Sequence, residues 1–258
     1  MKIRTWPKFA RKIRPRGNLL TQLDEFPDSI LVSGCQRSGG TMLAKCISGH
    51  SQMTDFAWSR DAELDGALLL SGYAKLPPKG RYCFQTTYLN EQYCEYDKIS
   101  EPFKLIWLVR NPISVVYSMV HNWRRFALNE LFQSCGDELL NGVDRTRYNR
   151  WGVLGVKPVS RACLAYNGKV NQLRELSAKL PESSMMVLEY ETLVADKHAA
   201  LAAICSFTQL DLEDGFGATI NTASLNKAER ISPDERELVT HLCSDAYMQA
   251  RARVTSLA

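Results

Sequence analysis

Residues 29–41 read Ser29-Ile-Leu-Val-Ser-Gly-Cys-Gln-Arg-Ser-Gly-Gly-Thr41, a short apolar stretch followed by a turn rich in glycine and serine. A helical pattern begins near Thr41 and ends at Gly49. The segment therefore predicts a strand, a glycine-rich loop and a helix in immediate succession, which is how many α/β domains begin.

The loop from Gly34 to Thr41 follows the Walker A pattern G-x-x-x-x-G-K-[ST] except at one position. Gly40 stands in place of the lysine, and Arg37 brings a cation inside the loop instead. Backbone N–H groups of such a loop point inward, and the helix N-terminus adds partial positive charge. Ser38 and Thr41 add hydroxyl donors, so we expect an anion to bind here. The alternative is a purely structural turn, because short glycine motifs are weak signals.

The rest of the chain alternates between apolar strand-like stretches and helical patterns. This alternation predicts one α/β domain over residues 29–258, with a parallel sheet flanked by helices as in P-loop NTPases. We expect residues 129–160, which mix glycines with arginines, to form an irregular surface segment near the active site. Further strands are predicted at 81–86, 104–109 and 184–188, and helices at 61–72, 113–127, 161–180, 197–206 and 233–251.

A second anion motif follows the apolar strand that ends at Val109. It reads Arg110-Asn-Pro-Ile-Ser-Val-Val-Tyr-Ser118. Arg110 falls at the carboxyl end of a strand, where ligands of open α/β sheets bind. Pro112 suits the first turn of a helix, which places Ser114 and Ser118 on one face. An arginine with a serine two turns into the helix predicts a clamp for a second phosphate.

Together, and in this order, the two motifs resemble those of sulfotransferases that use 3′-phosphoadenosine 5′-phosphosulfate (PAPS). The loop is similar to their 5′-phosphosulfate loop, and the strand-Arg110-Ser118 arrangement is similar to their 3′-phosphate motif. The Arg-Ser-Gly version resembles the carbohydrate, protein-tyrosine and bacterial branches. Residues 187–193, Val-Leu-Glu-Tyr-Glu-Thr-Leu, are similar to the family's Tyr-Glu-Asp-Leu segment, and the resemblance covers about residues 29–210.

The resemblance implies transfer of a sulfuryl group from PAPS to a hydroxyl or amine by in-line displacement. The acceptor would be a small molecule, a carbohydrate or a peptide, and no metal and no nucleic acid would take part. Arg37 would neutralise the charge that builds on the leaving phosphate. Tyr190 would lie near the adenine, or else it is a buried tyrosine that closes the last strand. The implied cofactor-binding residues are Gly34, Arg37, Ser38, Gly39, Gly40 and Thr41 for the 5′-phosphosulfate, and Arg110 and Ser118 for the 3′-phosphate.

The chain departs from the family pattern at three places. The usual Thr-Thr pair is Gly40-Thr41 here, and the Lys-Thr-Pro segment after the third strand is Gln85-Thr-Thr87, without the lysine. The Arg-Lys-Gly segment of the soluble branch is also missing. We take residues 221–227 with Arg230 as its replacement.

A hydroxyl acceptor needs a general base. The family places an acid or a histidine shortly after the first helix, and Asp61 and Glu63 are the candidates here. The alternative for both is a solvated acid on a helix. We expect His50 to cap the first helix, and His121 to be a surface histidine or one with a structural partner.

Two other functions compete with sulfuryl transfer. A P-loop kinase or NTPase would need the Walker lysine and an acidic metal ligand after a strand, but the chain has Gly40 and Arg110 there. The other alternative is a catalytically inactive nucleotide-binding or tethering protein. The missing lysine of Gln85-Thr-Thr87 and the uncertain base keep this alternative open.

Residues 1–28 form a basic N-terminal arm. Its first 17 residues hold seven basic residues and no acid, whereas the remaining chain holds 25 basic and 28 acidic residues. The run favours a solvated, poorly ordered arm. A peripheral membrane tether is the alternative, which Trp6, Pro7 and Phe9 keep open.

The eight cysteines include no CxxC pair. The chain also lacks an apolar stretch long enough for a signal peptide or a membrane span. We therefore expect a cytoplasmic protein in which most cysteines are reduced and buried.

Overall fold

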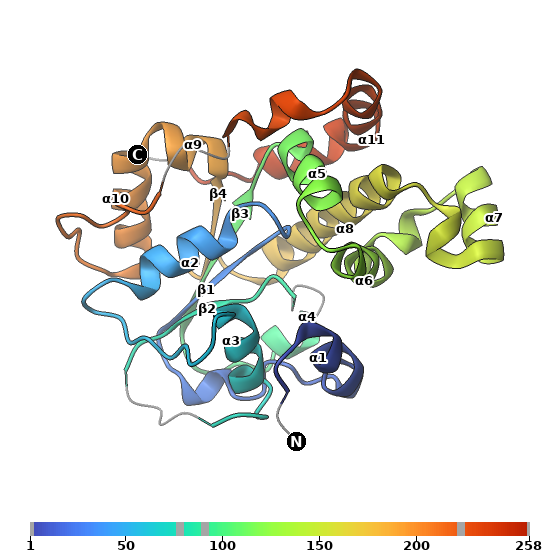
Figure 1. Ribbon diagram of the computed structural model, residues 1–258. Helices are drawn as coiled ribbons and strands as arrows, with labels where there is room; N and C mark the ends of the chain where they lie inside the picture. The colour runs from blue at the N-terminus through green and yellow to red at the C-terminus, as the bar shows by residue number, and fades with distance from the viewer. Residues whose placement is uncertain (1–2, 76–79, 89–92, 221–224, 257–258) are drawn as a thin grey trace.

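The computed structural model describes residues 3–75, 80–88, 93–220 and 225–256 (Figure 1). Helices and strands alternate along most of this length, as the sequence pattern predicts. In chain order the strands and α-helices are α1 (Trp6–Lys12), β1 (Ser29–Gly34), α2 (Gly40–Ser48), α3 (Ala62–Leu70), β2 (Cys83–Gln85), α4 (Tyr93–Tyr96), β3 (Phe103–Val109), α5 (Pro112–His121), α6 (Arg125–Cys135), α7 (Gly142–Trp151), α8 (Pro158–Lys179), β4 (Met185–Glu189), α9 (Tyr190–Ala195), α10 (Lys197–Thr208) and α11 (Pro233–Arg251).

The four strands form one parallel sheet in the order β2-β1-β3-β4. β1 and β3 are the central pair, and both are largely apolar because helices cover both faces of the sheet. From β1 the chain continues to β2 on one side, whereas β3 lies on the other side. The carboxyl end of β1 is therefore the topological switch point of the sheet, where open α/β sheets bind ligands.

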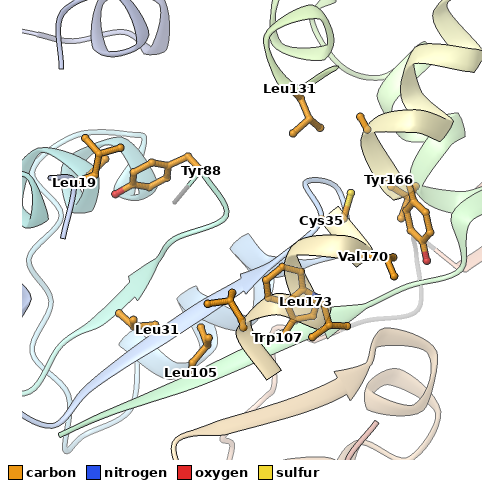
Figure 2. Close-up of a cluster of buried hydrophobic side chains, with 14 of the residues drawn as sticks. Leu19, Leu31, Cys35, Tyr88, Leu105, Trp107, Leu131, Tyr166, Val170 and Leu173 are labelled. Atoms are coloured by element: carbon orange, nitrogen blue, oxygen red, sulfur yellow. The ribbon is translucent and has the colours of Figure 1, made fainter. Parts of the chain in front are cut away.

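Successive residues of each strand enter opposite hydrophobic clusters, as the two-residue repeat of a strand requires. Leu31, Leu105 and Trp107 belong to the cluster on the α8 side of the sheet, where Leu173 lies beside Trp107 (Figure 2). The alternate residues of β1 and β3 face α2, α9 and α10 on the other side. The sheet is thus the middle layer of three, and both predicted features, a parallel sheet and flanking helices, are confirmed.

The basic N-terminal segment is not a solvated arm, and that expectation is wrong. Phe9 is only 1% exposed and belongs to the same hydrophobic cluster as the sheet. Trp6, Phe9 and Tyr88 form a triangle of rings with centroids 5.1–5.5 Å apart. Since these aromatic side chains are packed inside the protein, they no longer favour a membrane tether. The apolar residues of the run, rather than its charges, decide where it lies.

The expectation of an irregular segment over residues 129–160 is also wrong. Helices α6 and α7 and two 3₁₀ turns occupy most of it, and the predicted helix 113–127 divides into α5 and α6 at Asn122. α6 packs closely on α8 at Gly168, where an added Cβ would lie 1.8 Å from the Cys135 carbonyl oxygen. α7 buries none of its residues, which explains why its sequence lacks an apolar stripe.

All eight cysteines are free thiols, and six of them are buried. This agrees with the prediction of small apolar core residues. No helix among the described residues is long and apolar enough to cross a membrane.

Candidate functional site

The glycine-rich loop turns tightly between the end of β1 and the start of α2, and two glycines allow it to do so. Gly34 has φ of 137°, and an added Cβ would lie 2.5 Å from the Leu108 carbonyl oxygen of β3. Gly39 has φ of 102°, and its added Cβ would lie 2.6 Å from the Tyr190 ring. Other residues would be strained at both positions and would also clash with their neighbours. Close packing against β3 and the first residue of α9 therefore holds the loop in place.

The structure brings the two anion motifs together. The Arg37 Nε donates a hydrogen bond to the Ser118 hydroxyl oxygen over 3.0 Å. In the opposite direction, Arg110 Nη1 donates to the backbone carbonyl of Arg37 over 3.1 Å. The side chains of loop and second motif thus converge, although 73 residues separate Arg37 from Arg110. Besides burial, the charge of Arg37 lowers the pKa of Arg110, so an anion bound beside both arginines would be favoured.

Arg110 is held from three sides. Its guanidinium carbon lies 4.1 Å from the centroid of the Tyr190 ring, and its Nε lies 3.9 Å from a carboxylate oxygen of Glu191. The Tyr166 hydroxyl donates to its backbone carbonyl over 3.0 Å. Burial lowers the pKa of Arg110, and Tyr190 and Glu191 oppose that effect. Tyr190 itself is 2% exposed, which matches the alternative of a buried tyrosine at the end of the last strand, while its contact with adenine stays a prediction.

Ser38 and Thr41 differ in environment although both were predicted to bind the same anion. The Ser38 side chain is 1% exposed, and among the described residues its hydroxyl finds no hydrogen-bond partner. Thr41 is exposed in the first turn of α2 and lines a cavity beside the loop. A buried hydroxyl without a partner is costly. Ser38 therefore has a donor to give to a ligand.

Of the two predicted base candidates, Glu63 is the one whose carboxylate is desolvated and hydrogen-bonded through both oxygens. Gln85 Nε2 donates to one of its carboxylate oxygens over 2.9 Å, and the Thr87 hydroxyl donates to the other. Desolvation raises the pKa of Glu63 to about 7; Thr87 and Lys169 act against this rise, and Asp61 adds to it. A carboxylate with a pKa near neutrality can accept a proton at physiological pH.

Asp61, the other candidate, has a structural role. Its side chain accepts the Leu64 N–H as the N-cap of α3 and the Trp6 indole N–H over 2.8 Å. Both acids line the cavity beside the loop, but the Asp61 carboxylate is engaged by the cap and the indole, whereas burial raises the pKa of Glu63.

A cavity of about 880 Å³ opens beside the loop. Thr41 and Glu63 line it on the side of the sheet, the N-terminal segment lines it through Trp6 and Phe9, and α6 lines it through Leu131. Its volume suits a drug-sized molecule. The base candidate and the loop thus face one space that could hold an acceptor.

The sulfotransferase domain model matches residues 27–250 of the chain, which is most of its length. The chain belongs to the sulfotransferase family. No curated protein sequence matches it. The solved structures that it resembles include the sulfotransferase domain of the curacin biosynthetic pathway, with a TM-score of 0.56, 14% identity, and coverage of 85% of this chain and 98% of that one.

Two further solved sulfotransferase structures share the fold. The domain of the Synechococcus PCC 7002 olefin synthase has a TM-score of 0.52 at 15% identity, covering 90% of this chain and 97% of that one. The Alicyclobacillus acidocaldarius sulfotransferase has a TM-score of 0.50 at 12% identity, covering 88% and 94%. At such identities the likeness concerns the fold, and it confirms the predicted α/β class.

This member of the sulfotransferase family has a buried lysine that the sequence analysis missed. Lys169 of α8 is 1% exposed, donates to the Thr87 carbonyl over 2.8 Å and lines the cavity with Glu63. The sequence carried a signal for this burial. Lys169 lies three residues after Tyr166 and four before Leu173, which places it on the apolar stripe of α8. Lys169 thus places a buried cation next to the segment Gln85-Thr-Thr87.

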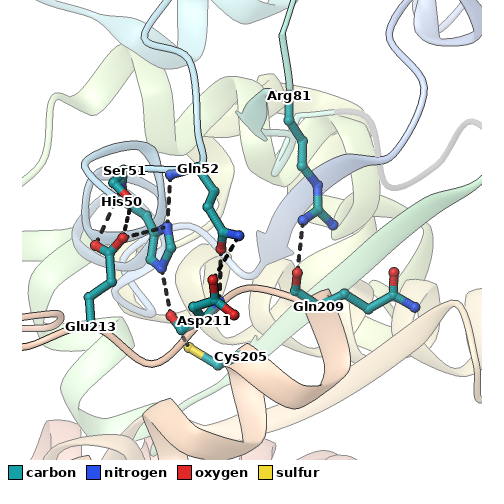
Figure 3. A network of polar contacts seen from close by, with 8 residues as sticks. All are labelled: His50, Ser51, Gln52, Arg81, Cys205, Gln209, Asp211 and Glu213. Atoms are coloured by element: carbon teal, nitrogen blue, oxygen red, sulfur yellow. Dashed lines mark hydrogen bonds and ion pairs between the residues drawn. The ribbon is translucent and has the colours of Figure 1, made fainter.

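The two histidine candidates have other partners. His50 follows α2, where its backbone N–H bonds to the Ile47 carbonyl; its ring lies 2.7 Å from the Asp211 carbonyl oxygen and accepts the Gln52 N–H (Figure 3). It joins the end of α2 to the chain after α10. His121 is exposed at the cavity, 3.3 Å from Glu235.

The proposed replacement of the Arg-Lys-Gly segment falls partly on residues 221–224, outside the described residues. No cluster of metal-ligating side chains occurs among the residues that the structure describes.

Proposed function

We propose that this chain transfers a sulfuryl group from PAPS to a hydroxyl or amine of an acceptor held in the cavity. The observation that carries the proposal is the hydrogen bond from Arg37 to Ser118, which joins the glycine-rich loop to the second anion motif. Two separate anion sites side by side suit a nucleotide that carries phosphates on both ends of its ribose. A triphosphate would need a single chain of adjacent sites and the Walker lysine, which Gly40 replaces.

The residues present fit such a nucleotide. Ser38 has a buried hydroxyl without a partner among the described residues, and the N-terminus of α2 points its N–H groups toward the loop. Gly40 leaves room at this point: an added Cβ would lie 3.6 Å from Gln85 and 3.7 Å from Thr87. We assign the 5′-phosphosulfate to residues 34–41, and the 3′-phosphate to Arg110 and Ser118.

Sulfuryl transfer forms a bond from the acceptor oxygen or nitrogen to sulfur, breaks the bond from sulfur to the bridging phosphate oxygen, and releases 3′,5′-ADP and a proton. We assign Glu63 as the group that accepts this proton. Gln85 and Thr87 each donate to one of its oxygens, so the carboxylate is fixed in orientation. The desolvation that raises its pKa to about 7 makes it a stronger base than an exposed glutamate.

Two cations would balance the negative charge of the reaction. Arg37 lies in the loop and would stabilise the leaving phosphate oxygens, since its guanidinium is already oriented by Ser118. Lys169 is held by the Thr87 carbonyl on the side of Glu63 and lowers the pKa of that carboxyl. We assign Arg37 to the stabilisation of the leaving group, and Lys169 to the stabilisation of the ionised form of Glu63.

Titration calorimetry with 3′,5′-ADP, 5′-AMP and ATP tests the donor site without requiring an acceptor. We expect 3′,5′-ADP to bind at least about tenfold more tightly than 5′-AMP, because one charge-assisted phosphate contact contributes roughly 1.5–3 kcal/mol. ATP bound as tightly as 3′,5′-ADP would overturn the assignment. Incubation with radiolabelled PAPS and a panel of phenols, alcohols and amines then separates an active transferase from an inactive nucleotide-binding protein.

A further inference from the structure

The N-terminal segment, residues 3–16, forms a wall of the cavity and lies opposite α6. Trp6 packs against Phe9 and Tyr88, and its indole N–H donates to Asp61, two residues before the base candidate. On the other side, Arg14 Nη1 lies 3.7 Å from a carboxylate oxygen of Glu130 on α6. The segment is therefore attached both to the helix that carries Glu63 and to the opposite wall.

Aromatic side chains line much of the cavity. Trp6, Phe9 and Tyr88 line one side of it, and Trp123 and Phe126 line the other. Phe126 remains 49% exposed although it lines the cavity, so a large apolar ring lies open to a ligand there. Aromatic walls favour a flat apolar body, because they bury it and stack on it. A strongly hydrated sugar would lose its water here with little compensation.

The mouth of the cavity is positively charged. Arg4 and Arg124 line the cavity and are exposed, which places them at its opening, and they come from the two opposite walls. Two of the three carboxylates that line the cavity are balanced by other cations of the wall: Glu130 lies 3.7 Å from Arg14, and Lys169 acts on Glu63. Asp61 is then the one carboxylate of the described lining left to offset the charges of Arg4 and Arg124.

We infer that the acceptor is a small molecule with an aromatic body and two different ends. Its nucleophilic hydroxyl lies at Glu63, its rings lie between Trp6 and Phe126, and a carboxylate or similar anionic group lies at Arg4 and Arg124. The inference rests on the proposed function in one respect: the acceptor hydroxyl points inward because Glu63 is assigned as the base. The N-terminal segment is then the element that determines acceptor choice, because it supplies Arg4 and Trp6.

The test uses a matched pair of probes, 4′-hydroxybiphenyl-4-carboxylic acid and 4′-hydroxybiphenyl-4-carboxamide, which differ in charge but hardly in shape. Binding is followed by quenching of tryptophan fluorescence in the full-length chain saturated with 3′,5′-ADP, since Trp6 and Trp123 line the cavity. We expect the acid to bind about three- to tenfold more tightly than the amide, the range of one or two solvent-exposed charge contacts. Raising the salt concentration should reduce the difference.

Variants locate the effect. In the Arg4→Ala/Arg124→Ala double variant the preference for the acid should disappear while amide binding persists. Arg11→Ala, which removes an exposed arginine of the same segment that does not line the cavity, should keep the preference. Equal binding of acid and amide to the parent chain, failure of both to bind, or a preference that survives the double variant would overturn the inference.

Failure of the proposed function gives a different result. In that case 3′,5′-ADP shows no advantage over ATP, or no label is transferred from PAPS to the acid, whatever the probes do in the cavity. If the double variant instead lost affinity for 3′,5′-ADP itself, the two arginines would belong to the donor site, and the inference would be wrong.

Discussion

The donor side and the acceptor side of this site are built in different ways. On the donor side, residues 34–41 and 110–118 each supply a complete local unit, a strand that runs into a loop and a helix. On the acceptor side, single residues from α3, α6, α8 and the N-terminal segment meet around a cavity. The first side depends on backbone geometry that a short sequence fixes, and the second depends on how distant elements pack.

The two sides meet at Gln85 and Thr87. Both contact Glu63, and both lie next to the position of a Cβ at Gly40. The segment that lacks the family's lysine thus orients the base candidate. The residues that depart from the family pattern on the donor side thus hold Glu63 on the acceptor side.

The largest effect is expected at Glu63. Glu63→Gln should lower kcat by about two to four orders of magnitude, the usual contribution of a general base, while 3′,5′-ADP affinity changes little. The matched control is Asp61→Asn, whose amide oxygen can still cap α3, so that it should change stability little and cause no comparable loss of kcat. A larger loss of kcat in Asp61→Asn than in Glu63→Gln would exchange the two assignments.

The pH profile gives an independent check on Glu63. The base must be deprotonated, so kcat/KM should rise with pH through about 7, where the raised pKa of this carboxyl lies. An acid limb near pH 4–5 would indicate an exposed glutamate that does not feel the desolvation.

The packing of the N-terminal segment should contribute several kcal/mol to the free energy of unfolding. Phe9→Ala should lower the free energy of unfolding by about 3–5 kcal/mol, because Phe9 is 1% exposed. Lys8→Ala, at an exposed neighbouring position, should stay within about 0.5 kcal/mol. Urea denaturation measures both. A solvated arm would predict no effect from either change, and deletion of residues 2–17 would then be tolerated.

Arg37→Ala should lower kcat by about two to three orders of magnitude, the range for one preorganised donor. Affinity for 3′,5′-ADP should fall less, because the backbone N–H groups of the loop remain. Arg37→Lys should keep part of the activity, since a point charge replaces the planar fork. A rise in KM alone, measured in steady-state assays, would show that Arg37 binds ground state and transition state equally.

Arg110→Ala should weaken 3′,5′-ADP binding by roughly 10- to 150-fold, the scale of one charge-assisted contact. Arg174→Ala, at an exposed position on α8, serves as the control for a general change in charge. Calorimetry measures both variants, and circular dichroism checks that the stacking partner Tyr190 still supports the fold. Unchanged affinity would remove Arg110 from the clamp.

Lys169→Met should have the smallest effect, a shift in the pH dependence of kcat/KM. Lys169 lowers the pKa of Glu63, so its removal should raise that pKa and move the acid limb of the kcat/KM profile to higher pH. Lys179→Met changes an exposed lysine of the same helix and should leave the limb in place. An unshifted limb in Lys169→Met would show that the buried charge does not act on the base.

Sequence reasoning worked best where the evidence was local. The four strands were predicted within a few residues, because apolar stretches bounded by turns correspond closely to buried strands. It failed for residues 129–160, where α7 lies on the surface with no apolar stripe to reveal a helix. It also failed for the N-terminal segment, where the count of charges concealed that Ile3, Phe9 and Ile13 are buried and Trp6 is half-buried.

The sequence by itself determined the donor side: a glycine-rich loop after the first strand, an arginine after the third, and the α/β class around them. Only the tertiary structure decided that burial raises the pKa of Glu63 while Asp61 caps α3, that Lys169 lines the cavity, and that residues 3–16 form one of its walls. The physical reason is the range of the interactions. Turn geometry and helix N-termini act over fewer than about ten residues. Burial and desolvation, by contrast, depend on segments that meet only after folding.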